Sequence, residues 1–540
     1  MSALQRVSRR ARRSIWILDA AILGSTPAGW PETRVRARST ALVEAGFLAL
    51  GSFLLYWFTL APTVLWGDDA LLQVQAFQGQ LRASAGSHPL WVLVAHLFTK
   101  LPFGDVAYRV NLVSALFGAV TVGLLDLCLR ELRVSRPARV ATVTAFAVSH
   151  TFWAHAVRTE VYTMTLATLA LVILFALRWQ RSGHPRELVF LGMALGIALN
   201  THVMVLLLGP ALLWLLVVRR QALTPRAVGW ALIAVLVTLI PLATLLWLDS
   251  QRLGMDLLQS LHWALFEFDG FNFRGRFFRF AWATFPRDLS QWLGYLTLQF
   301  LGPALVAGIL GAVVSWKRLG RSQALFLALL YLVPAAFAFA YDVGDRYVFY
   351  LPSYLAFALW MGLGFQWLWQ RLQARPPAWI SPKGALYAGL ALIVLLPVLT
   401  YRLTPELLYR YSPQFRQVRR VPGPNSHYFL LWPSRANYYD AREYAEAVLD
   451  ALPEDAVFLA EPVLATPVRY LQSVEGLRPD VTVRFCCWDV EEALAEAGER
   501  PLVVADLAEG VYPVAMLEER YQIQPLPPVY VLTPRSQQRP

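Results

Sequence analysis

Charged residues are scarce in this sequence. Only 16% of its 540 residues are Asp, Glu, Lys or Arg, and 57% are hydrophobic, whereas an ordinary soluble domain has about 25% charged and about 45–50% apolar residues. Apolar runs of about 17–25 residues, long enough for a helix to cross a bilayer, recur over most of the chain. The composition therefore excludes an ordinary soluble protein and predicts a polytopic α-helical membrane protein.

Cysteine and nucleotide-binding motifs are also lacking. Cys128, Cys486 and Cys487 are too few for a disulfide framework, and the adjacent pair suits neither a mutual disulfide nor a zinc site. The part of the sequence from Pro422 onward, which has a soluble composition, has no phosphate-binding loop and no glycine-rich dinucleotide fingerprint. The net charge of +12 would suit nucleic acid in a soluble protein. Here the arginines collect in loops between apolar segments, so we expect a lipid bilayer as partner and no nucleic acid.

About eleven apolar segments fit membrane-spanning helices, two of them short. They lie near residues 41–60, 108–130, 138–154, 161–178, 187–200, 203–218, 227–248, 291–314, 323–341, 347–369 and 384–401. Arginine and lysine gather in every second connection, at 130–139, 178–186, 219–226, 317–321 and 371–383. By the positive-inside rule, this alternation predicts a cytoplasmic N-terminus and an extracytoplasmic C-terminal part in the inner (cytoplasmic) membrane.

Three regions follow from this topology. We expect a basic cytoplasmic arm at 1–40, a transmembrane domain at 41–401 with long external loops at 61–107 and 249–290, and an external linker and small α/β domain at 402–540. Within the first loop, 71–77 is spaced as an amphipathic helix lying on the membrane, and 90–101 suits an interfacial or re-entrant helix. In the last region, strands at 456–460, 481–485, 501–505 and 529–532 alternate with helices at 438–452, 466–472 and 491–497, which favours a largely parallel sheet.

Two adjacent acids, Asp68 and Asp69, follow the first spanning segment. Paired carboxylates beside a low-dielectric phase are costly, so they indicate a task such as proton abstraction or the binding of a hydroxyl or a cation. The alternative is structural, because Asp is a favoured N-cap and either acid can cap a helix starting at Ala70. We take the pair as the catalytic candidates, with one acid as base and the second holding an acceptor or a cation.

Polar residues in the other external loops are candidate substrate ligands. Arg158 and Glu160 are spaced two apart, which is poor for pairing along a helix, so each is expected to have another partner. For several candidates a structural alternative stays open: interfacial anchoring for Tyr162, snorkelling for Arg158, a satisfied turn for His202, and a surface ion pair for Asp345 and Arg346. The aromatic loop at 249–290 can likewise be an interface belt. The full candidate set is His88, Arg158, Glu160, Tyr162, His202, Arg274, Arg276, Asp345 and Arg346.

The sequence resembles the bacterial relatives of the animal transmembrane O-mannosyltransferase, within the GT-C superfold. The matching stretches are Trp66–Asp69, His88–Trp91, Tyr108–Gly118, Thr151–Trp153, Glu160–Thr163, His202, Asp345–Tyr354, Tyr470–Gln472 and Arg478–Val481. The family typically has Trp-Asp-x-Gly-Glu in its first loop, whereas Gly67-Asp68-Asp69 follows Trp66 here. Which aspartate replaces which acid therefore stays open.

The resemblance implies an enzyme. The expected reaction is inverting transfer of a sugar, with mannose as the expected sugar, from a polyprenyl-phosphate donor to an extracytoplasmic hydroxyl on a protein or glycan. The sequence requires no cofactor, and two acids alone are a thin ligand set for a divalent metal, so no metal site is assigned. Two alternatives remain at this point: a lipid-sugar flippase, and a non-catalytic assembly factor whose outer domain recruits partners.

Overall fold

The computed structural model describes residues 32–268, 271–485 and 490–535. The chain forms two compact units, residues 1–47 and 48–540. Helix α2 (Glu32–Phe58) begins in the first unit and continues into the second. Most of the predicted basic arm, residues 1–31, lies outside the described residues, and the arm's last part is helical from Glu32 onward.

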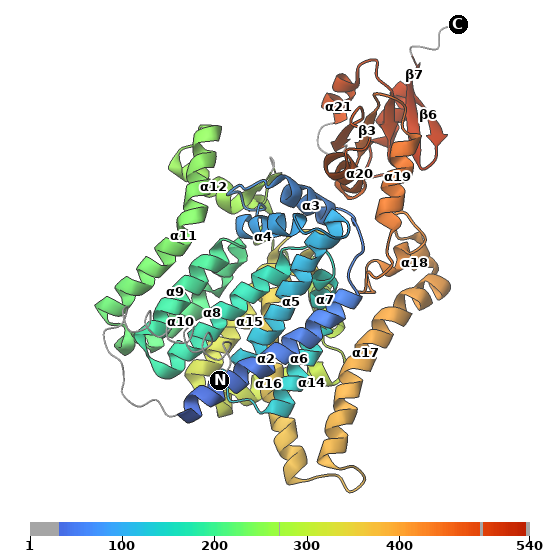
Figure 1. Ribbon diagram of the computed structural model, residues 1–540. Coiled ribbons are helices and arrows are strands. Elements are labelled where there is room, and N and C mark those ends of the chain that lie inside the picture. Colours follow the sequence, from blue (N-terminus) through green and yellow to red (C-terminus); the bar gives the residue numbers. More distant parts are fainter. Residues whose placement is uncertain (1–31, 269–270, 486–489, 536–540) are drawn as a thin grey trace, which may run out of the picture. The chain divides into compact units, whose positions relative to one another are not determined.

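Helices make up nearly all of the second unit as far as residue 428 (Figure 1). Their bounds are α3 (Asp68–Gln78), α4 (Pro89–Thr99), α5 (Val106–Glu131), α6 (Arg136–Ala147), α7 (His150–Ala156), α8 (Tyr162–Ser182), α9 (Pro185–Leu199), η1 (Val203–Leu208), α10 (Gly209–Val218), η2 (Arg220–Ala222), α11 (Pro225–Leu253), α12 (Leu257–Phe266), η3 (Arg274–Arg276), α13 (Phe285–Gln299), α14 (Pro303–Arg318), α15 (Arg321–Ala340), η4 (Arg346–Tyr350), α16 (Leu351–Ala374), α17 (Pro382–Tyr411), α18 (Pro413–Gln417) and η5 (Ser426–Tyr428). Strands β1 (Glu267–Phe268) and β2 (Phe271–Asn272) form a short antiparallel hairpin between α12 and η3.

The chain is a multi-pass membrane protein. Among the described residues, seven helices are long and apolar enough to cross a membrane, and α13 with α14 would make an eighth although they meet at 111°. Each of the eleven predicted segments is helical, but four are interrupted: 138–154 divides into α6 and α7, 203–218 into η1 and α10, 291–314 into α13 and α14, and 347–369 into η4 and α16. Hydrophobicity alone thus located the helical segments and missed the breaks within them.

Helices α14 and α16 pack closely because small residues line their contact. A Cβ at Gly311 would lie 1.7 Å from the carbonyl oxygen of Trp360, and one at Gly364 would lie 1.9 Å from that of Ala307. Small side chains at such crossings allow two backbones to approach, which is a common way to join helices in a membrane. This crossing holds α16 in place. The polar residues at 341–346 lie just before the N-terminal end of α16 in the chain.

The C-terminal region is an α/β domain. It contains α19 (Asp440–Ala451), β3 (Val457–Ala460), α20 (Pro462–Glu475), β4 (Thr482–Phe485), α21 (Val490–Ala497), β5 (Leu502–Val504), α22 (Val514–Arg520), β6 (Tyr521–Leu526) and β7 (Val529–Pro534). The strand order is β4-β3-β5-β7-β6. The expectation of a largely parallel sheet is only half right, because β4, β3 and β5 are parallel whereas β5–β7 and β7–β6 are antiparallel. The undetected strand β6 carries Pro525 at the sheet edge, where proline is tolerated.

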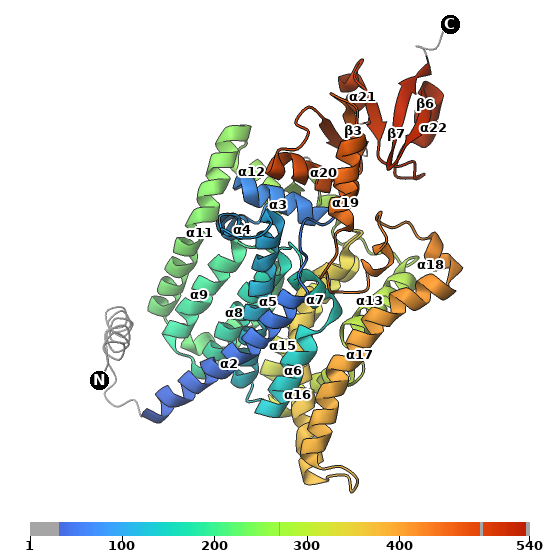
Figure 2. The same ribbon diagram turned by 45° about the vertical axis from the view of Figure 1, so that its right-hand side comes forward.

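The predicted first-loop helices are present as α3 and α4. Rather than lying free, α3 packs between α4 on one side and α20 of the α/β domain on the other (Figure 2). Ala70, Leu72 and Ala76 are buried in these contacts. The predicted amphipathic face of 71–77 therefore covers protein, and the α/β domain reaches the acidic end of α3.

Candidate active site

The acidic pair begins helix α3. Gly67 is the N-cap residue, and its φ of 64° and ψ of −128° suit glycine because it has no Cβ. Asp68 and Asp69 occupy the first helical turn, so neither of them is the N-cap residue. The structural alternative of N-capping is therefore wrong for both acids. Negative charge in the first turn is favoured by the helix dipole, which partly offsets the cost of placing two acids side by side.

Asp69 belongs to a buried charge cluster. It is only 2% exposed, and its Oδ2 lies 3.8 Å from Nη1 of Arg158. Arg158 Nη2 donates a 2.9 Å hydrogen bond to Oε1 of Glu160. Arg158 thus has another partner besides Glu160, as predicted. The two nevertheless pair with each other, because residues 157–160 are not helical and the helical spacing argument does not apply.

The Arg158 guanidinium interacts with several carboxyl groups of this cluster. Burial raises the pKa of Asp69 to about 6, with Arg158 opposing the shift and Asp68 adding to it. Burial likewise raises the pKa of Glu160 well above its ordinary value. For Arg158, burial opposes the charged form, but Asp69 and Glu160 outweigh it and raise the guanidinium pKa. Within the described residues, Oδ1 of Asp69 has no hydrogen-bond partner, which is uncommon for a buried polar atom and typical of a functional site.

A second cation, Arg435, was not predicted. It is 3% exposed, donates to the carbonyls of Trp432 and Phe429, and acts electrostatically on Asp69. Burial, with help from Arg158, lowers the pKa of Arg435 to about 10. Its sequence position in the linker before the α/β domain gives no sign of this role, because only the tertiary fold brings the linker to the first loop.

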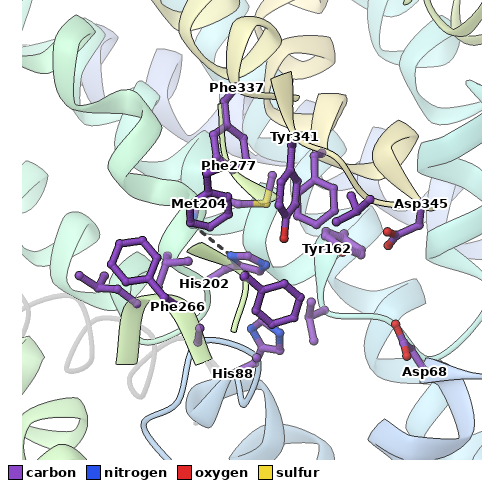
Figure 3. A pocket seen from close by; sticks show the side chains of 18 of the residues that line it. Asp68, His88, Tyr162, His202, Met204, Phe266, Phe277, Phe337, Tyr341 and Asp345 are labelled. Carbon is purple, nitrogen blue, oxygen red and sulfur yellow. Dashed lines mark hydrogen bonds between the residues drawn. The ribbon is translucent and has the colours of Figure 1, made fainter. Parts of the chain in front are cut away.

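A cavity of about 500 Å³ opens beside the cluster (Figure 3). Asp68 and Asp345 lie at one end of it, and Phe266, Phe277 and Phe337 lie at the other. The remaining described lining residues are Leu71, Leu72, Gln75, Ala85, Gly86, His88, Glu160, Val161, Tyr162, His202, Val203, Met204, Leu206, Leu207, Leu265, Phe273, Phe278, Tyr341, Val343 and Phe349. The cavity is thus acidic at one end and apolar and aromatic at the other.

Asp68 and Asp345 are exposed to this cavity. The protein around the cavity nevertheless displaces much of their water. Burial therefore raises the pKa of Asp68, against the opposing charge of Arg158. Burial raises the pKa of Asp345 to about 6, and the charge of Asp68 contributes. A carboxylate with a raised pKa and access to a cavity is suited to accept a proton near neutral pH.

His88 and His202 form a neutral pair in the cavity wall. Their ring centroids are 4.6 Å apart. Burial lowers the pKa of His88 to about 4 and lowers that of His202 well below its ordinary value. Nδ1 of His88 lies 3.0 Å from the carbonyl oxygen of Thr201, so it carries the proton and Nε2 is left as an acceptor. Nδ1 of His202 accepts from the Met204 amide at 3.1 Å, which leaves Nε2–H of His202 as a donor.

The structure brings together most of the predicted site residues, but three lie elsewhere. Arg274 and Arg276 are exposed residues of η3 and are not among the described lining residues. Arg346 donates to Oδ1 of Asp288 at 3.1 Å instead of turning to the cavity. In residues 32–268, 271–485 and 490–535, no group of three or more His, Cys, Asp or Glu is arranged to hold a metal ion.

Comparison with solved structures identifies the architecture. ArnT from Cupriavidus metallidurans bound to undecaprenyl phosphate superposes with a TM-score of 0.55 at 14% identity, covering 92% of this chain and 99% of ArnT. The apo state of the same protein gives a TM-score of 0.55 at 15% identity, covering 92% and 98%. The chain has the GT-C fold. At this identity the likeness concerns the fold alone.

Sequence comparison adds a resemblance to this GT-C chain. Residues 80–224 match the family described as the N-terminal domain of protein O-mannosyl-transferase TMEM260. The mouse protein O-mannosyl-transferase TMEM260 is 25% identical over 463 residues, which are 79% of this chain and 60% of the mouse protein. The predicted resemblance to this family and to the GT-C superfold is confirmed. The chain spans less than two thirds of the mouse protein's length.

Proposed function

We propose that the protein is a GT-C glycosyltransferase that moves a sugar, with mannose as the candidate, from a polyprenyl-phosphate donor to a hydroxyl on an extracytoplasmic protein or glycan. The observation that carries the proposal is the two-ended cavity of a GT-C fold, acidic at Asp68 and Asp345 and aromatic at Phe266, Phe277 and Phe337. A polyprenyl-phosphate sugar has the same two-ended chemistry, with a polar sugar phosphate joined to an apolar chain.

The proposed step has one base and one leaving group. The acceptor oxygen attacks the anomeric carbon, the bond from that carbon to the phosphate oxygen breaks, and the phosphate leaves with the bonding electrons. The acceptor proton passes to the carboxylate of Asp68, which faces the cavity. Attack opposite the leaving phosphate inverts the anomeric centre. A positioned base of this kind contributes about 10²–10⁴-fold to a rate.

The remaining cavity residues would orient the substrates. Nε2–H of His202 is a donor toward the cavity, and Figure 3 shows the hydroxyl of Tyr341 directed inward. These neutral groups, with the Tyr162 hydroxyl, are suited to hydrogen-bond the donor phosphate or the sugar. Asp69 and Glu160 both contact Arg158, so the proposed role of this buried cluster is to shape the electrostatic field around Asp68. Glu160 also lines the cavity, whereas Asp69 and Arg158 are not among the described lining residues.

The test is transfer by the purified protein in detergent. A mannosyl-phosphoryl polyprenol and a hydroxyl acceptor are supplied, and released polyprenyl phosphate is quantified. Detergent leaves no membrane to cross, so release also separates a transferase from a flippase. We expect Asp68→Asn to lower release by at least about a hundredfold, whereas Asp342→Asn, a half-exposed acid outside the cavity lining, keeps the wild-type rate. Wild-type release by both Asp68→Asn and Asp69→Asn would refute the proposal.

A further inference from the structure

The α/β domain holds the residue that precedes the acidic pair. Thr466 Oγ1 in α20 donates a 2.9 Å hydrogen bond to the carbonyl oxygen of Gly67. On the other side of the same residue, the Gly67 amide donates to the carbonyl oxygen of Val463 at 3.4 Å. Both peptide units of Gly67 are therefore bound to one turn of α20, although the two segments are about 400 residues apart in sequence.

A proline in α20 explains why the Val463 carbonyl can accept this bond. In a regular helix, the carbonyl of Val463 would accept the amide of the residue four positions later, which is Pro467. Proline has no amide hydrogen, so that carbonyl lacks its helical donor. The Gly67 amide takes the vacant place. The adjacent residues Thr466 and Pro467 thus provide, in one turn, a donor and a free acceptor for Gly67.

These two hydrogen bonds between α20 and Gly67 affect how the carboxylates of Asp68 and Asp69 are placed. Gly67 is the N-cap of α3 and has a backbone conformation open chiefly to glycine, so the chain can readily rotate there. Helix ends fray, and Asp68 and Asp69 are in the first turn. A reacting group needs placement to within about 0.5 Å. Fixing both peptide units of Gly67 fixes the direction in which the first turn of α3 presents its two acids.

We infer that Thr466 and Pro467 of α20 are positioning residues for the Asp68–Asp69 pair, so that the α/β domain is a working part of the transfer site. The inference rests on the proposed function for its catalytic meaning. The two hydrogen bonds between α20 and Gly67 are a property of the folded chain, so their effect on α3 can also be measured without an activity assay.

The activity test compares variants of the same interface. Thr466→Val removes the hydroxyl donor, Thr466→Ser keeps it, and Pro467→Ala supplies an amide that competes with Gly67 for the Val463 carbonyl. The matched control is Tyr470→Phe, which loses the bond from the Tyr470 hydroxyl to Asp105, another contact between α20 and the first loop. We expect Thr466→Val and Pro467→Ala to lower kcat about tenfold or more at an unchanged donor KM. Thr466→Ser and Tyr470→Phe should stay within twofold of wild type.

Hydrogen exchange of the full-length protein gives the second readout. A peptide covering residues 67–71 should exchange faster in Thr466→Val and Pro467→Ala than in wild type or Tyr470→Phe. Unchanged exchange and unchanged kcat in both variants would overturn the inference, and so would equal losses in Tyr470→Phe, which would indicate general domain attachment. If Thr466→Val does not fold, Pro467→Ala decides alone. Absence of transfer by the wild type would refute the proposed function. The exchange result would then still test whether Thr466 and Pro467 hold the first turn of α3 in place.

Discussion

Replacing Asp69 with asparagine should stabilise the protein at neutral and alkaline pH while impairing transfer. Asp69 is 2% exposed, and burial raises its pKa from the ordinary 3.8 to about 6. A carboxyl whose folded-state pKa is raised favours folding when protonated and opposes it when ionised. Its contribution to stability is therefore present below about pH 4 and is lost as the pH rises through about 6. Asparagine keeps the shape and carries no charge.

The magnitude follows from the size of the shift. A change from 3.8 to about 6 at about 1.4 kcal/mol per pKa unit gives a gain of about 3 kcal/mol above pH 7. This is an upper limit, because Arg158 loses one of its two carboxylate partners in the variant. The gain should vanish at pH 4, where wild-type Asp69 is itself mostly protonated.

The assay is the apparent melting temperature of detergent-solubilised protein, followed by tryptophan fluorescence at one heating rate between pH 4 and pH 8. Asp480→Asn is a control of opposite sign, because hydrogen bonds from Arg478 lower the pKa of that exposed acid, so its loss should not stabilise at any pH. Should Asp69→Asn melt below wild type at pH 8, the ionised carboxylate would be a net stabilising partner of Arg158. The buried charge of Asp69 would then not lower the stability of the fold, contrary to what we expect.

Four further outcomes follow from the same geometry. Arg158→Gln leaves two buried carboxyls without their cation and should destabilise the fold by about 3–5 kcal/mol, seen as a large fall in melting temperature. Gly311→Ala places a methyl against the carbonyl of Trp360 and should lower the monodisperse fraction in size-exclusion chromatography. Phe277→Ala should raise the KM for a long-chain donor more than for a short-chain one. Transfer should lose rate as the pH falls through the raised pKa of Asp68, above the ordinary aspartate range, which a kcat/KM profile will show.

Local patterns predicted the helical segments and their order. The run at 227–248 became α11, which begins after a Thr224 side-chain cap and ends at Leu253, followed by Gly254 in the left-handed region. The breaks were missed because hydrophobicity continues through them. Gly302, with a φ of 59°, and Pro303 at the first position of α14 mark the 111° bend within 291–314. That glycine-proline signal was visible in the sequence, although the run around it reads as one span.

The site was predicted only in part, because topology groups the loop residues but does not show where the linker and the α/β domain fold back. Loops between spanning helices return to the same side, so residues such as Asp68, Glu160, His202 and Asp345 could be grouped from topology alone. The contributions of Arg435 and α20 depend on where the linker and the α/β domain fold back, and no local pattern encodes that. Arg346 was misplaced as a cavity candidate because Asp288, its partner, lies 58 residues away.

We propose Asp68 as the base of a sugar transfer in the two-ended cavity. The most direct measurement is single-turnover release of polyprenyl phosphate by purified wild type, Asp68→Asn and Asp342→Asn, with each variant first shown to melt like a folded protein. We expect release by wild type and Asp342→Asn and a loss of at least about a hundredfold in Asp68→Asn. A folded Asp68→Asn variant that releases polyprenyl phosphate at the wild-type rate would contradict this proposal.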